Sequence, residues 1–295
     1  MLCSFMNYIN SFMAQLRMIK IRKYNNTFEY LEVKNKSSSA KIALQGAHIF
    51  DYSNKSTQLL WLSEESSFIQ GEAIRGGIPL CWPSFGMNNP SLSQHGFART
   101  SLFTLISVNE ENDTSSEILL RLSHSKQSLA LWDYKFELTL KITISDTLSL
   151  ELQTINLDTK VFKVTQAFHT YFNISNIDDV KISGLDKKPY LNALTNRMQN
   201  QVGDIKFKAE VDCVYQDVHE CLILEDKKTQ VKICNEGSSS VIIWNPWIEK
   251  CARMSAMNKD AYKKFVCVES ANAYKDFKTL KPNESHTLKT TFTTL

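Results

Sequence analysis

"YKFELTLKITIS", residues 134–145, alternates apolar and polar side chains without a break. A period of two places every second side chain on the same face of a β-strand, so this segment is predicted to be a strand with one buried face. The turn-forming residues "SDT" (145–147) follow, and the alternation resumes from Leu148 to Leu152. The two strands are therefore predicted to form a hairpin.

Similar strand patterns recur along almost the whole chain, while helical periodicity is nearly absent. Many closely spaced strands with few helices are typical of a sandwich or barrel, so we expect an all-β protein built as one large antiparallel sandwich. Residues 1–18 are interpreted as an N-terminal extension and 19–295 as a single domain. Further strands are predicted at 19–24, 28–34, 40–52, 58–62, 102–109, 117–124, 161–168, 230–235, 240–244, 265–269 and 286–293, and helical turns near 126–132 and 258–264.

Composition limits the classes of partner. The chain has 34 Lys+Arg against 31 Asp+Glu, and this net charge of +3 gives no electrostatic reason to expect a nucleic acid. No window approaches the roughly 20 consecutive apolar residues of a membrane span. Seven cysteines without a C-x-x-C pair favour packing cysteines in a reducing compartment over a disulfide framework. We expect a cytoplasmic protein without a nucleic-acid or membrane partner, present as a monomer or weak dimer.

Two irregular stretches, 71–100 and roughly 185–229, interrupt the β pattern. The first contains "RGGIPLCWPSFG" (75–86), with three of the nine glycines of the chain, and "QHGFART" (94–100). Two arginines and a histidine in one glycine-rich segment suit a phosphate or carboxylate, because Arg pairs with oxyanions through two hydrogen bonds. A rigid surface loop whose arginines pair with local acids is an equally good interpretation. The residues concerned are Arg75, His95 and Arg99.

Three further residues are candidates for chemistry. His169 stands in "AFHTYFNI" (167–174), where a lone histidine is more often a hydrogen-bonded core residue than a catalytic one. Glu269 in "VCVES" and Asp212 in "AEVDCVY" either lie at exposed strand ends or line a cleft, and the sequence does not choose. The chain has no H-x-H, H-E-x-x-H, C-x-x-C or G-x-S-x-G, so spacing predicts neither a metal site nor a serine nucleophile.

"RGGIPLCWPSFG", "HGFART", "FHTYF", "WNPW" (244–247) and "VCVES" follow one another in the order found in one family. On these motifs the chain resembles the glucose-6-phosphate 1-epimerases (hexose-6-phosphate mutarotases), a branch of the aldose 1-epimerase group, over residues 19–295. The resemblance implies a β-supersandwich of the galactose mutarotase type with a cleft on one sheet. It also implies an isomerase that exchanges the α and β anomers of a hexose 6-phosphate, most of all D-glucose 6-phosphate, without a cofactor or metal.

The resemblance also assigns roles to individual residues. His169 resembles the catalytic acid and Glu269 the catalytic base. We expect each to stabilise the charge of the other, so that both are charged over about pH 5–7.5. The implied substrate-binding residues are Arg75 and Arg99 on the phosphate, His95, and Asp212 on the sugar hydroxyls.

One segment departs from the family pattern, and two other functions stay open. After "WNPW" the family usually has a small residue and an acidic segment, whereas this chain has "IEKCARMSAMNKD" (248–260), which leaves the sugar preference at that rim open. A carbohydrate-binding β-sandwich without catalysis would not need the pair of His169 and Glu269. A glycosidase would use Glu269 with Asp212 as its two carboxylates.

Overall fold

The computed structural model describes residues 17–54, 57–87 and 89–295, which fold mainly into antiparallel β-sheets. Most of the predicted N-terminal extension, residues 1–16, lies outside the described residues, and the single domain over 19–295 stays a prediction. No helix in the described part of the chain is long and apolar enough to cross a membrane.

The hairpin predicted from residues 134–152 lies within an eight-stranded sheet. β9 (Phe136–Ile144) and β10 (Thr147–Asn156) pair antiparallel, and every second side chain in each is buried. The predicted alternation is therefore confirmed: one face of the sheet packs into the core and the other does not. In spatial order the strands are β14 (Lys181–Ser183), β18 (Leu222–Glu225), β19 (Gln230–Glu236), β23 (Ser285–Thr294), β10, β9, β8 (Ser115–Ser123) and β7 (Thr104–Asn112).

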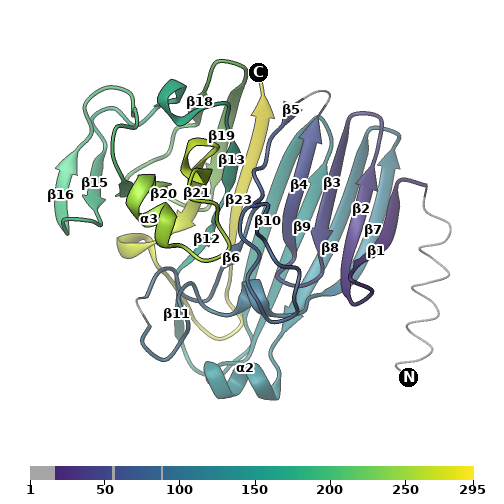
Figure 1. Cartoon of the computed structure of the whole chain (residues 1–295). Helices are drawn as coiled ribbons and strands as arrows, with labels where there is room; N and C mark the ends of the chain where they lie inside the picture. Colours follow the sequence, from purple (N-terminus) through teal and green to yellow (C-terminus); the bar gives the residue numbers. More distant parts are fainter. Residues whose placement is uncertain (1–16, 55–56, 88) are drawn as a thin grey trace.

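A five-stranded sheet covers one half of this sheet (Figure 1). The Tyr52 hydroxyl donates a hydrogen bond of 2.9 Å to the Ser145 carbonyl and so joins the two sheets. The predicted strand 40–52 is wrong, because the chain turns back at Gly46 and Ala47, which both have positive φ. In the sequence only Gln45 and Gly46 mark this turn, because apolar residues stand directly on both sides of them. The strands are β1 (Ile19–Tyr24), β2 (Phe28–Lys34), β3 (Ser38–Ala43), β4 (His48–Asn54) and β5 (Thr57–Gln58).

A second eight-stranded sheet covers the other half (Figure 1). Phe172 of this sheet packs edge-on against Phe292 of β23, with ring centroids 5.1 Å apart, so the two sheets share one core. In spatial order it contains β16 (Arg197–Asn200), β15 (Pro189–Asn192), β17 (Val211–Tyr215), β20 (Ser240–Asn245), β21 (Phe265–Asn272), β12 (Gln166–Phe168) and β6 (Leu80–Cys81), while β13 (Tyr171–Asn173) pairs with β21.

The stretch 185–229 is less irregular than the sequence suggests, because β15 to β18 lie within it. β15 and β16 are half-buried or exposed, so they lack the apolar alternation that marks a strand in the sequence. The remaining elements are β11 (Phe162–Val164) paired with β22 (Lys278–Leu280), α2 (Lys126–Leu131), α3 (Trp247–Arg253), and single 3₁₀ turns at Ala98–Thr100, Ile177–Asp179, Ala261–Lys263 and Tyr274–Asp276.

One pair of cysteines departs from the expected absence of disulfides. Cys221 and Cys234 are bonded, because the pairing of β18 with β19 places them opposite each other. Sequence spacing does not show which residues face each other across strands. The other cysteines within the described residues are buried and not disulfide-bonded, as expected of packing cysteines: Cys81, Cys213, Cys251 and Cys267.

Candidate active site

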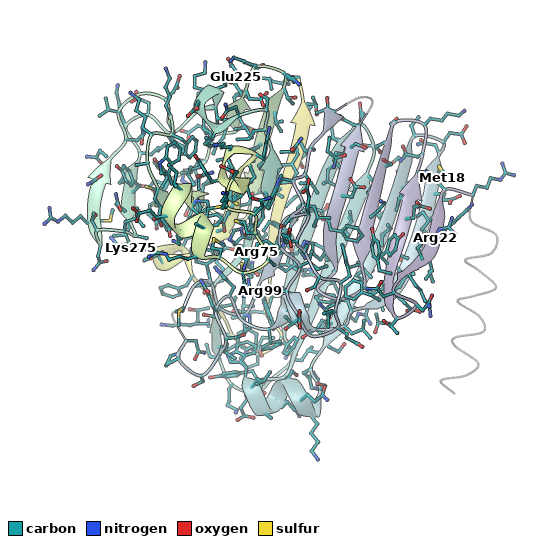
Figure 2. All side chains as sticks on the ribbon, in the orientation of Figure 1. Met18, Arg22, Arg75, Arg99, Glu225 and Lys275 are labelled. Carbon is teal, nitrogen blue, oxygen red and sulfur yellow. A yellow bond between two sulfur atoms is a disulfide. The ribbon has the colours of Figure 1, made fainter. Side chains whose placement is uncertain are left out.

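All of the site residues predicted from the sequence line one cleft of about 460 Å³ on the second eight-stranded sheet. Figure 2 labels the two arginines near the centre of the molecule, where the loops meet this sheet. The fold therefore brings together side chains that lie up to 194 positions apart in the chain (269 − 75). The predicted residues are Arg75, His95, Arg99, His169, Asp212 and Glu269.

The acid–base candidates stand side by side because of strand register. β12 pairs with β21 so that Phe168 faces Ser270, and the next residue, His169, therefore stands beside Glu269. Glu269 in turn faces Ile242 of β20. Side chains two residues apart in a strand point to the same face, so Asp212, Trp244 and Tyr171 form a second row along the same cleft floor.

His169 and Glu269 form a buried pair. His169 Nε2 lies 3.5 Å from Glu269 Oε1, and the two residues are only 9% and 1% exposed. The imidazole stacks on the Tyr171 ring at 4.9 Å, which fixes its plane. His169 Nδ1 and Glu269 Oε2 have no hydrogen-bond partner among the described atoms. Buried polar atoms without partners are rare, and here they are available to a ligand.

The resting protonation of this pair is opposite to the sequence-based expectation. Burial lowers the pKa of His169 well below its ordinary value of 6.5, and His95, Arg99 and Arg75 lower it further. Burial raises the pKa of Glu269 well above 4.5, and the charge of Asp212 raises it further. Each group therefore favours its neutral form, because burial away from water is the largest influence on both pKa values.

The glycine-rich segment sets the position of Arg75. Gly76 has φ +108°, and a Cβ there would lie 2.6 Å from the Trp61 carbonyl oxygen, so a larger residue would push the loop away from residues 61–63. The Arg75 backbone N–H donates to Ser66 Oγ at 2.9 Å. The buried Nε of Arg75 has no hydrogen-bond partner. No described carboxylate forms an ion pair with its guanidinium, which argues against the surface-loop interpretation.

Arg99 and His95 border the same cleft. Arg99 Nη2 donates to the Gln94 carbonyl at 2.7 Å and, like Arg75, pairs with no described carboxylate. His95 Nδ1 accepts from the Gly86 N–H at 3.2 Å, so the neutral ring carries its proton on Nε2. Burial, with Arg99 and Arg75, lowers the pKa of His95 to about 3, which keeps the ring neutral at physiological pH. His95 can therefore donate one hydrogen bond to a bound oxygen.

Lys250 is a cleft residue that the sequence did not single out. It lies on α3, in the segment 248–260 that departs from the family pattern, and that departure was its only sequence signal. Its Nζ lies 2.8 Å from Glu210 Oε1 and 3.7 Å from Asp212 Oδ2. Burial raises the pKa of Asp212, and the Lys250 ammonium opposes this rise. Lys250 thus holds the Asp212 carboxylate in place and favours its charged form.

Among the described residues, one group of side chains could offer ligands to a metal ion: His169, Cys267 and Glu269, whose donor atoms lie within 4.8 Å of one another. Sequence spacing cannot reveal this set, because it forms across strands. Burial and Glu269 raise the pKa of the Cys267 thiol well above 9.0. Only the thiolate is a good metal ligand, and Arg75 adds positive charge nearby, so we assign no metal here.

Comparison with known proteins agrees with the fold and the cleft. The sequence pattern of the family described as "Aldose 1-epimerase" matches residues 29–293. The chain belongs to the aldose 1-epimerase family, and it is more specifically similar to proteins named "Putative glucose-6-phosphate 1-epimerase". It is 35% identical to the one from Cenchrus ciliaris (83% of this chain, 78% of that protein). It is 31% identical to the one from Escherichia coli K12 (92% of each).

Solved structures extend the comparison. A crystal structure titled as a "putative mutarotase" from Salmonella typhimurium matches with a TM-score of 0.88 and 28% identity, over 97% of this chain and 99% of that one. A galactose mutarotase-like protein from Lactobacillus casei matches with a TM-score of 0.71 and 16% identity, over 90% and 100%. The fold is thus that of galactose mutarotase-like proteins, which confirms the fold expected from the sequence.

Proposed function

We propose that this chain interconverts the α and β anomers of a hexose 6-phosphate, with D-glucose 6-phosphate as the favoured substrate. One observation carries the proposal: Arg75 and Arg99, which no described carboxylate pairs with, line the same cleft as the buried pair of His169 and Glu269. Guanidinium groups bind phosphate through paired hydrogen bonds. If the arginines bind the phosphate, the anomeric carbon of the same sugar can lie beside His169 and Glu269.

The reaction needs two proton transfers. Glu269, as carboxylate, takes the proton from the C1 hydroxyl, and His169, as imidazolium, gives one to the ring oxygen O5. The C1–O5 bond breaks and C1 becomes the carbonyl carbon of the open-chain aldehyde. Rotation about C1–C2 presents the other carbonyl face, and ring closure with both transfers reversed gives the other anomer. Asp212 and His95 would hold sugar oxygens during these steps.

The substrate itself would prepare the catalytic pair. Burial favours a neutral imidazole and a protonated carboxyl, which together hold one proton, the same number as the reactive form. Arg99 and Arg75 help to keep His169 neutral. A phosphate dianion on these arginines cancels that repulsion, so it raises the pKa of His169 and favours the imidazolium. Phosphorylated sugars would then react faster as well as bind more tightly.

Exchange NMR on α-D-glucose 6-phosphate, with and without the protein, tests the proposal directly. We expect catalysed α–β exchange that is lost in His169→Ala and that is much weaker for D-glucose. Binding without catalysed exchange would favour a carbohydrate-binding module instead. Release of the aryl group from an aryl glycoside would favour a glycosidase, and equal rates on glucose and glucose 6-phosphate would contradict the role of the arginines.

A further inference from the structure

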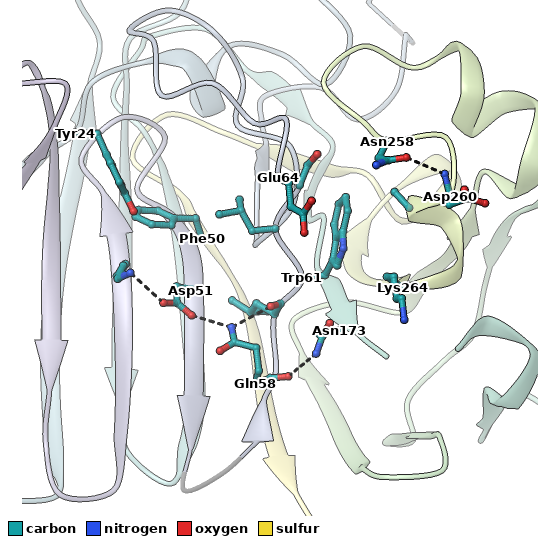
Figure 3. A pocket seen from close by; sticks show the side chains of 15 residues that line it. Tyr24, Phe50, Asp51, Gln58, Trp61, Glu64, Asn173, Asn258, Asp260 and Lys264 are labelled. Atoms are coloured by element: carbon teal, nitrogen blue, oxygen red, sulfur yellow. Dashed lines mark hydrogen bonds and ion pairs between the residues drawn. The ribbon is translucent and has the colours of Figure 1, made fainter. Parts of the chain in front are cut away.

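A second cavity shares no lining residue with the catalytic cleft, although Trp61, which lines it, packs on Tyr171 of that cleft. It encloses about 630 Å³, which falls in the range of sites for drug-sized ligands. Figure 3 shows Trp61 on one side of it and Tyr24 with Phe50 on the other. We call it the Trp61 cavity.

The aromatic walls of the Trp61 cavity are held rigidly. The centroid of the Trp61 ring lies 4.5 Å from that of Phe265 and 5.8 Å from that of Tyr171. The Phe265 and Tyr171 rings are both buried. Because Trp61 itself is only half-buried, part of the indole borders the cavity. On the opposite side Tyr24 stacks on Phe68 at 4.2 Å. A ring already fixed by packing loses little conformational entropy when a ligand covers it.

Hydrogen-bonding groups between these walls are oriented but not saturated. The Gln58 amide nitrogen donates to Asp51 Oδ1 at 2.8 Å and to the Leu60 carbonyl at 3.1 Å, which leaves its oxygen as an acceptor. The Asn173 side-chain nitrogen donates to the backbone carbonyl of Gln58 at 3.2 Å, so the Asn173 side-chain oxygen also remains as an acceptor. No described atom accepts a hydrogen bond from the Trp61 indole N–H. Gln58, Asn173 and Trp61 therefore contribute two acceptors and one donor at this aromatic surface (Figure 3).

The charges that line the cavity do not favour an anion. Lys41 lies 3.6 Å from Asp51, so these two largely neutralise each other, and Asp260 pairs with Lys263 at 3.0 Å. Glu64 and Lys264 add one charge of each sign, and no arginine contributes to the lining. This contrasts with the two arginines of the catalytic cleft. A hydroxyl group both donates and accepts, so a polyhydroxylated ring can satisfy all of these groups without an ionic charge.

We propose that the Trp61 cavity is an accessory, non-catalytic site for an uncharged saccharide, in which a pyranose ring packs on the indole of Trp61 and its hydroxyls bond to Gln58 and Asn173. The proposal does not depend on the proposed function, because it requires neither a phosphate nor a reactive anomeric carbon. A test ligand without either group therefore separates the two sites.

Methyl α-maltoside is such a probe, and isothermal titration calorimetry measures its binding. We expect a Kd on the order of 1 mM, as for a small site with few hydrogen bonds. Saturating glucose 6-phosphate, or the cleft variant Asp212→Ala, should change this Kd by less than about twofold. The double variant Gln58→Ala/Asn173→Ala should raise it at least about fivefold, while Lys232→Ala on β19, outside both cavities, should not change it.

The double variant alters two exposed side chains, so it avoids the risk that Trp61→Ala unfolds the packed rings, and its circular dichroism spectrum checks the fold. Loss of maltoside binding in Asp212→Ala would place the saccharide in the catalytic cleft and overturn the proposal. An unchanged Kd in the double variant would also overturn the proposal. The same holds if the wild type does not bind the maltoside at about 50 mM. Binding of adenosine at the cavity without binding of the maltoside would show that its ligand is a flat base instead.

Discussion

His169 Nε2 lies 3.5 Å from Glu269 Oε1, because His169 directly follows β12 and so stands beside Glu269 of the neighbouring strand β21. The contact is longer than a charge-assisted hydrogen bond, and the outer atoms Nδ1 and Oε2 are buried without partners. An unsatisfied buried pair costs stability, and such groups concentrate at functional sites. These two outer atoms are therefore available to a ligand in the cleft.

Replacing either member of the pair should remove turnover while leaving binding intact. Glu269→Gln keeps the size of the side chain but cannot take a proton, so we expect kcat for anomer exchange to fall at least about 10²-fold with a Kd for glucose 6-phosphate within a fewfold of wild type. His169→Asn should behave alike. Exchange NMR and calorimetry measure the two quantities. The losses should not add in the double variant, and a wild-type kcat in Glu269→Gln would place the base elsewhere, with Asp212 the next candidate.

The pH profile of kcat/KM should be bell-shaped. We expect the histidine to set its acid limb and the glutamate its alkaline limb, which is the reverse of the order that their ordinary pKa values would give. Burial lowers the pKa of His169 well below 6.5 and raises that of Glu269 well above 4.5, so the form of the pair with one proton carries that proton on Glu269. The acid limb then marks a second proton on His169, and the alkaline limb marks loss of the proton from Glu269. Asp212→Asn removes a charge that raises the pKa of Glu269, so it should move the alkaline limb to lower pH. An unmoved alkaline limb would contradict this assignment.

The arginines should act on substrate binding through the phosphate. Charge-assisted hydrogen bonds contribute about 1.5–3 kcal/mol each, so Arg99→Ala should raise KM for glucose 6-phosphate by about 10–100-fold. KM for unphosphorylated glucose should change less than about twofold. Arg197→Ala is the matched control, because Arg197 is exposed on β16 and does not line the cleft. Similar losses with both sugars would show that Arg99 supports the structure of the cleft rather than the phosphate.

The core strands and the residues that line the cleft could be predicted from the sequence. The protonation of the cleft residues could not. The alternation in 136–156 predicts β9 and β10 because burial on one face has a period of two. The half-exposed strands β15 and β16 have no such pattern, so 185–229 reads as irregular. Lys250 was missed because its role depends on Asp212 across the cleft. The pKa shifts of His169 and Glu269 arise from burial, which a sequence does not contain.

Lys250 should tune substrate binding through Asp212. Lys250→Ala removes the ammonium 3.7 Å from the Asp212 carboxylate, so the pKa of Asp212 should rise further and its side chain should lose a fixed orientation. We expect KM for glucose 6-phosphate to rise about three- to tenfold with a smaller change in kcat. Lys250→Arg should restore most of the affinity, because it keeps the charge. A purely structural role would instead lower the melting temperature and leave KM unchanged.

Glu269→Gln should also stabilise the folded protein, by an amount that depends on pH. The pKa of Glu269 is raised in the folded state, so above pH 4.5 the unfolded chain releases a proton that the folded protein retains. The stability of the wild type therefore declines as pH rises from 4.5 through the folded pKa. The amide of the variant binds no such proton, so the variant lacks this decline. The melting temperature of the variant, relative to wild type, should increase from pH 4.5 upward, by a few degrees at most.

Glu225→Gln provides a control of opposite sign. Glu225 on β18 accepts a hydrogen bond from Gln230 at 2.8 Å and lies 3.4 Å from Lys181, and these contacts lower its pKa. Its ionised form is favoured in the folded protein, so stability from this group is present above the unfolded pKa and is lost as pH falls. The variant should therefore melt slightly below wild type at pH 8 and approach it in acid, an effect kept small because the group is exposed.

Differential scanning calorimetry at pH 4.5, 6 and 8 compares all three proteins. A melting difference for Glu269→Gln that does not change with pH would mean that Glu269 has the same proton affinity folded and unfolded, and the acid–base assignment built on its burial would have to be abandoned.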